Sequence, residues 1–134
     1  MSRILGLDVG TKRIGISMSD PTGIIASPVG TIPAKPQAEA ITKIKTICRE
    51  NNVETIVVGL PKNMNNTIGP QAQYSMDFAQ NFENEFNIVF EDERLTSRQA
   101  EKILAATGRK YTKDKGLTDT KSACIILQQY LDSK

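Results

Sequence analysis

Arg3-Ile4-Leu5-Gly6-Leu7-Asp8-Val9-Gly10 is the stretch that decides the fold of this chain. Its apolar residues form a short run that is typical of a strand buried on both faces of a sheet. Asp8 interrupts the run near its end, and a buried carboxylate costs free energy unless a partner or a cation compensates. Two interpretations are open from this stretch alone. Asp8 either opens a hairpin turn together with Gly10, or is a functional carboxylate at the end of a central strand.

The length and composition indicate one globular domain over residues 1–134, with 39% hydrophobic and 24% charged residues. The net charge is only +2, so a face that binds nucleic acid would have to be a local basic patch. The chain enters its first strand directly, without a signal-peptide pattern. No apolar run approaches the roughly 20 residues that span a bilayer. We therefore expect a cytoplasmic protein with no membrane partner.

Histidine is absent, which excludes imidazole bases, Ser-His triads and His-ligated zinc. The two cysteines, Cys48 and Cys124, lie far apart in helical patterns, which favours two buried free thiols over a disulfide. Any chemistry must therefore depend on carboxylates, lysines, hydroxyls or a metal ion held by oxygen atoms.

Hydrophobic periodicity predicts the order of the elements. After the first strand, alternation predicts a second strand over 13–19 and a third over 24–32, where Pro28 suits an edge strand. Continuous apolar runs predict further strands over 54–60 and 87–93. Helical spacing predicts helices over 37–52, over 70–86, after Thr96 as far as Gly108, and from near Thr118 and Asp119 to the end.

This order predicts an α/β fold with a five-stranded mixed sheet in the order 3-2-1-4-5. Strand 2 is antiparallel, and helices cover both faces. Ligands of such sheets bind beyond the carboxyl ends of the parallel strands. Asp8 and Glu93 end two of these strands, with the small residue Gly59 on the strand between them. Neighbouring strands lie about 4.8 Å apart, so the two acid backbones would be roughly 10 Å apart, within joint reach of bound metal ions.

Asp119, at the start of the last helix, is a candidate third carboxylate above this edge. Each acid also has a plain structural interpretation: Glu93 as an exposed strand-end acid beside Arg94, and Asp119 as a helix N-cap. Three acids near one sheet end favour the functional interpretation, because clustered carboxylates repel one another unless cations are bound. Oxygen ligands alone suit Mg²⁺ or Mn²⁺.

Four motifs carry a resemblance to a known family. They are Gly6-Leu7-Asp8-Val9-Gly10-Thr11-Lys12-Arg13-Ile14-Gly15, Val58-Gly59-Leu60-Pro61, Asp92-Glu93-Arg94-Leu95-Thr96, and Asp119 followed by Ile126-Leu127-Gln128-Gln129-Tyr130-Leu131-Asp132. In family order and over the whole chain, they resemble the YqgF family. Its members are pre-16S rRNA nucleases, also called Holliday junction resolvase-like, with an RNase H-like fold.

The resemblance implies that Asp8, Glu93 and Asp119 are the catalytic acids and the metal ligands. Two departures from the family pattern, Ser122 and the loop pair Asn65-Asn66, leave these acids unaffected. The implied reaction is phosphodiester hydrolysis with two divalent ions, which needs no histidine.

Basic residues near the predicted site suit backbone phosphates: Lys12, Arg13, Arg109, Lys110, Lys113 and Lys115. The resemblance implies structured RNA or branched DNA as the partner, and we expect either a monomer or a homodimer. Two other function classes are open. Asp8-Val9-Gly10-Thr11 also resembles the phosphate loop of actin-like and sugar-kinase ATPases, which need two such domains. A non-catalytic RNA-binding protein could keep the same fold without binding Mn²⁺.

Overall fold

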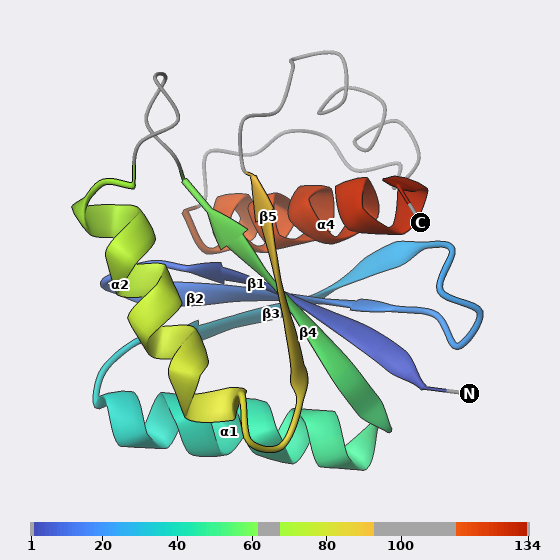
Figure 1. Ribbon diagram of the computed structural model, residues 1–134, viewed down its shortest axis with the longest axis horizontal. Coiled ribbons are helices and arrows are strands. Elements are labelled where there is room, and N and C mark those ends of the chain that lie inside the picture. The colour runs from blue at the N-terminus through green and yellow to red at the C-terminus, as the bar shows by residue number, and fades with distance from the viewer. Residues whose placement is uncertain (1, 62–67, 93–114, 134) are drawn as a thin grey trace.

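The computed structural model describes residues 2–61, 68–92 and 115–133, and of residues 115–119 it describes the backbone only. Five strands form one mixed sheet in the order β3-β2-β1-β4-β5 (Figure 1). The strands are β1 (Arg3–Val9), β2 (Arg13–Ser19), β3 (Ala26–Pro33), β4 (Val53–Leu60) and β5 (Asn87–Asp92). β2 is antiparallel to both of its neighbours, whereas β1, β4 and β5 run parallel. The predicted strand order and the central position of β1 are thus confirmed.

The alternation of side chains along β1 divides the core into two layers. Leu5 and Leu7 face the layer of α1 (Gln37–Glu50), α2 (Pro70–Ala79) and the 3₁₀ turn η1 (Gln80–Phe82). Ile4 faces the other layer, where α4 (Lys115–Ser133) packs across the sheet. Helices therefore cover both faces, as predicted. Among the described residues, no helix is long and apolar enough to cross a membrane.

Side-chain hydrogen bonds to the backbone move two predicted element ends. The third strand begins at Ala26 rather than at residue 24, because the Asp20 carboxylate accepts the backbone N–H groups of Ile24 (2.8 Å) and Ile25 (2.9 Å). These bonds, and one from the Thr22 hydroxyl, hold the pKa of Asp20 well below its usual range. Ile24 and Ile25 consequently stay in the turn, with exposed fractions of 63% and 59%.

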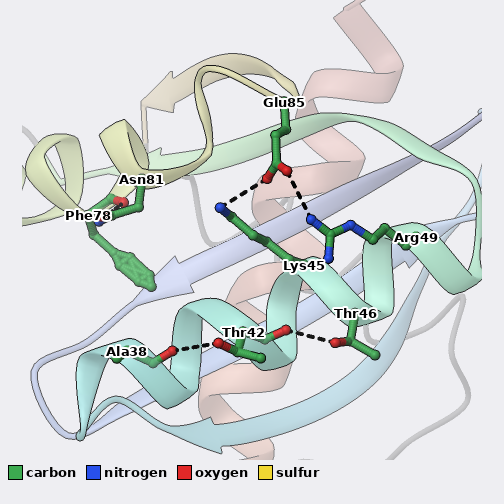
Figure 2. Close-up of polar contacts among 8 residues, drawn as sticks. All are labelled: Ala38, Thr42, Lys45, Thr46, Arg49, Phe78, Asn81 and Glu85. Atoms are coloured by element: carbon green, nitrogen blue, oxygen red, sulfur yellow. Dashed lines mark hydrogen bonds and ion pairs between the residues drawn. The ribbon is translucent and has the colours of Figure 1, made fainter.

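The helix predicted over 70–86 ends at Ala79 and continues only as η1. The Asn81 side-chain amide donates to the Phe78 carbonyl at 2.9 Å, which competes with continuation of the helix (Figure 2). The turn then places Phe82 in the core against Phe78, with ring centroids 5.5 Å apart.

An ion-pair cluster ties the turn after η1 to α1. Glu85 accepts from Lys45 Nζ and from Arg49, both at 2.9 Å, and the two cations lower the pKa of its carboxyl group (Figure 2). All three side chains are partly or largely exposed, so this cluster orients the turn more than it stabilises the fold.

Both cysteines are free thiols buried in helices, as predicted: Cys48 in α1 and Cys124 in α4. Burial raises the pKa of Cys48 to about 12. The helix predicted after Thr96 lies outside the described residues.

Candidate active site

Asp8 lies one residue before the end of β1, on the face of the sheet that α4 covers. Alternate residues of a strand share a face, so Gly6 lies on the same face as Asp8, and the atoms near Gly6 show what covers that face. A Cβ atom at Gly6 would lie 2.8 Å from Leu127 Cβ and 3.0 Å from the Ala123 carbonyl oxygen. Glycine is therefore required where α4 crosses β1, and the half-buried Asp8 follows it along the same face.

Hydrogen bonds define the direction of α4 over the sheet. Ser17, which pairs with Gly6, donates to the Ala123 carbonyl at 2.8 Å. Nearer the start of β1, the Gln128 side chain accepts the Ala26 N–H at 2.9 Å. Toward the end of β1, the α4 residues in contact with the sheet have lower numbers. The two elements therefore run in opposite directions (Figure 1).

This direction brings the first turns of α4 to the Asp8 end of β1. Asp119 is one helical turn before Ala123, about 6 Å along the axis. Asp8 is two residues beyond Gly6, about 6.6 Å along the strand. The backbone of Asp119 therefore lies at the same edge as Asp8. Because α4 begins at Lys115, the N-cap interpretation of Asp119 is wrong: the residue is in the second turn of the helix.

The pairing of β4 with β5 shows which described residue of β5 is level with Asp8. Leu7 pairs with Val58, and the next residue of β4, Gly59, pairs with Glu91. The row from Asp8 therefore passes Gly59, which has no side chain, and reaches Glu91. Glu93 comes after the last residue of β5, Asp92, and lies outside the described residues.

The Glu91 carboxylate is held by a side chain of α4, the helix that covers its face of the sheet. Gln129 Nε2 donates to Glu91 Oε1 at 2.7 Å and to the Asp92 carbonyl at 3.1 Å. Sequence reasoning missed this contact. Alternation along β5 could have placed Glu91 on the α4 face with Val89, but residue 129 is distant in sequence and is brought there only by the packing of α4.

With this geometry in view, comparison with known proteins identifies the family. A family model described as "RuvX: Holliday junction resolvase" matches residues 2–133. The chain belongs to the RuvX family. RuvX and YqgF denote the same family, so the resemblance carried by the sequence motifs is confirmed.

Two relatives of the RuvX-family chain cover almost its whole length. A protein of Clostridium kluyveri, named "Putative pre-16S rRNA nuclease", is 44% identical over 132 residues, which are 97% of this chain and 96% of that one. A protein of Clostridium botulinum strain Hall with the same name is 44% identical over 133 residues, 98% and 97% of the two chains.

Solved structures confirm the RNase H-like fold of this RuvX-family chain. Thermus thermophilus RuvC matches with a TM-score of 0.64 at 11% identity, over 98% of this chain and 95% of that one. The Fowlpox virus resolvase, solved with Holliday junction DNA, matches with a TM-score of 0.62 at 12% identity, over 98% and 97%.

The basic residues predicted for RuvX-family substrate binding are described in part. Lys12 is exposed in the turn after β1, and Arg13, the first residue of β2, is half-buried. The Gly10 N–H donates to the Arg13 carbonyl at 2.9 Å, which closes this turn beside Asp8. Arg109, Lys110 and Lys113 lie outside the described residues, as does the side chain of Lys115 at the start of α4.

The donor chemistry at this edge fits a hard divalent cation. Asp8 presents carboxylate oxygens from a half-buried position, and the chain has no histidine that would favour a softer metal. Within the described side chains, no group of three acidic, histidine or cysteine residues could hold a metal ion. Asp8 is the one predicted ligand whose side chain is described, since Glu93 and the Asp119 side chain are not.

Proposed function

We propose that this RuvX-family protein is a divalent-metal-dependent nuclease that processes the 5′ end of pre-16S rRNA in the cytoplasm, as a single domain. The observation that carries the proposal is the position of Asp8, a half-buried carboxylate at the end of the central strand under the first turns of α4. The names of the full-length relatives support this reaction class and the RNA substrate.

In this proposal, Asp8, Glu93 and Asp119 hold Mg²⁺ or Mn²⁺. A pair of such ions, when bound, supplies water activation and charge neutralisation at the scissile phosphate. Of these acids, the structure describes Asp8 on β1 and the backbone of Asp119 on α4. Asp8 is fixed by the β1 ladder and Asp119 by the packing of α4 over Gly6. Fixed carboxylates need little rearrangement when the substrate binds.

The substrate backbone is bound in our proposal by Lys12 and Arg13, together with Arg109, Lys110, Lys113 and Lys115. Lys12 lies in the turn after the Asp8 strand and Arg13 begins β2, so phosphates bound by these two residues would lie beside Asp8. Contacts of this kind position the substrate without reading its sequence.

Resolution of Holliday junctions is the second candidate function, and the description of the RuvX family favours it. A resolvase makes two symmetric cuts and would normally act as a homodimer, whereas trimming one RNA end needs only a monomer. Substrate preference and oligomeric state are therefore tested together.

A cleavage assay with Mn²⁺ tests the proposal, comparing a precursor 16S rRNA fragment with a four-way DNA junction on protein of measured oligomeric state. We expect cleavage of the RNA, and none by Asp8→Asn protein or in the presence of a chelator. Cleavage of the junction alone, by a dimer, would establish the resolvase function instead. Cleavage of neither substrate would contradict the nuclease proposal.

A further inference from the structure

Two glutamines bind the carbonyl oxygens at the ends of two strands near the acids. Gln71 Nε2 of α2 donates to the Val9 carbonyl at 3.1 Å, and Val9 is the last residue of β1. Gln129 Nε2 of α4 donates to the Asp92 carbonyl at 3.1 Å, and Asp92 is the last residue of β5. The two glutamines approach from opposite faces of the sheet, because α2 and α4 belong to different layers.

The bond from Gln71 holds the backbone directly after Asp8. Val9 is paired with Ile14 in the β1 ladder, and the Gln71 bond adds a side-chain restraint to the same backbone from α2. The peptide unit is planar, so a donor on the Val9 carbonyl also restrains the start of the turn that carries Lys12. Gln71 is itself largely exposed, so its single bond adds little to folding stability.

The orientation of the Gln129 amide is fixed by its partners. Both N–H bonds of Nε2 are used, one by Glu91 and one by the Asp92 carbonyl. The reverse orientation would place the amide oxygen against these two acceptors. As oriented, Gln129 Oε1 is buried and has no hydrogen-bond partner in the structure as described. An unpaired buried oxygen costs stability, and an apolar side chain of the same length would avoid that cost.

We propose that Gln71 and Gln129 are positioning residues of the nuclease reaction. They hold the ends of β1 and β5, so that the proposed ligands Asp8, on β1, and Glu93, which follows β5 in the sequence, keep the spacing that metal binding requires. This inference rests on the proposed function. Partners that orient metal ligands contribute about 10-fold to 100-fold in activity or metal affinity, even though they touch neither metal nor substrate.

The test replaces each glutamine by methionine, which keeps the length of the side chain and removes its donors. Gln73→Met and Gln128→Met are matched controls on the same two helices. The Gln73 side chain donates to Asp77, and the Gln128 side chain bonds to the backbone of Ile24 and Ala26 and to Asp132. We expect Gln71→Met and Gln129→Met each to lower kcat about tenfold while KM changes less than about twofold.

Calorimetric titration with Mn²⁺ gives a second readout, in which affinity should fall by a similar factor of about ten in the two positioning variants. Gln129→Met loses two hydrogen bonds but also removes the unpaired buried oxygen, so its Tm should fall by no more than that of Gln128→Met. Gln128→Met should lower Tm and leave kcat unchanged. A purely structural role for Gln129 predicts instead that Gln129→Met lowers kcat only to the extent that it lowers Tm.

Glu91→Gln separates the strand end from the carboxylate, because Gln129 can still donate to the Asp92 carbonyl. This variant should keep kcat close to the wild-type value. A loss as large as that of Gln129→Met would overturn the inference. Equal kcat in the positioning variants and their controls would also overturn the inference. The nuclease proposal would still stand in that case, because the wild-type protein cleaves. A wild-type protein that cleaves neither substrate would overturn both.

Discussion

At the scale of single residues, Asp8 is the acid on which the proposed chemistry depends. Its carboxylate is half-buried in a central strand, where a charge is costly. Asp8→Asn should therefore reduce metal-dependent cleavage to background while the free energy of unfolding stays the same or rises. Cleavage rates and urea denaturation measure the two effects. Asp77→Asn, the same change at an exposed site on α2, should alter neither. Cleavage by Asp8→Asn near the wild-type rate would remove Asp8 from the site.

The buried thiols give a residue-scale test of the packing. Burial raises the pKa of Cys48 to about 12, so very little of the reactive thiolate is present at pH 8. Cys48 should therefore react far more slowly with a thiol reagent in native protein than in urea, and buried Cys124 should also be slow. Thiol labelling followed by mass spectrometry measures both. Rapid native labelling of both cysteines would show that these helix faces are not packed as described.

At the scale of elements, the contact of α4 with β1 determines where the helix lies relative to Asp8. A Cβ at residue 6 would lie 2.4 Å from Ser17 Oγ, in addition to its close approaches to Leu127 and Ala123. Gly6→Ala should therefore push α4 away from the sheet and cost about 1–3 kcal/mol of stability. Chemical denaturation measures this cost.

The Gly6→Ala/Ser17→Ala double variant is the control for this prediction. Removal of the Ser17 hydroxyl relieves the nearest contact, so the two changes should together cost less than the sum of their separate costs. Strict additivity would mean that the hydroxyl does not limit the approach of α4.

The elements also show what sequence reasoning could and could not establish. Apolar runs and alternation predicted every described strand and the central place of β1, because a sheet buried on both faces needs such patterns. The start of β3 and the end of α2 were mispredicted, because Asp20 and Asn81 bind backbone groups and stop the regular ladder. Such side-chain bonds depend on local geometry that periodicity does not contain.

The site was predictable to a similar degree. The position of Asp8 near the end of the central strand was predicted from the sequence and is confirmed, whereas its catalytic role stays a prediction. The contacts of Gln71 with Val9 and of Gln129 with Glu91 and Asp92 could not be predicted, because they require the packing of two helices on opposite sheet faces. Long-range packing, rather than residue type, selects these glutamines from their neighbours Gln73 and Gln128.

At the scale of the whole molecule, the proposed site needs a positive field to attract a polyanion past its own acids. The net charge of +2 is too small to provide this field uniformly. Local basic segments must therefore act, and the segment 109–115, with Arg109, Lys110, Lys113 and Lys115 against one acid, is the richest candidate. It leads directly into α4, whose first turns lie at the Asp8 edge.

Neutralising Lys110 and Lys113 together to glutamine should consequently weaken nucleic-acid binding about equally for any sequence. The slope of log affinity against log salt should become shallower by about one to two, because fewer counterions are released. Cleavage at saturating substrate should change little, since the acids are untouched. Lys35→Gln/Lys43→Gln is the matched control: it removes the same charge from exposed lysines before and on α1, in the layer opposite α4. An equal loss of affinity in both double variants would mean that net charge, rather than the 109–115 segment, attracts the substrate.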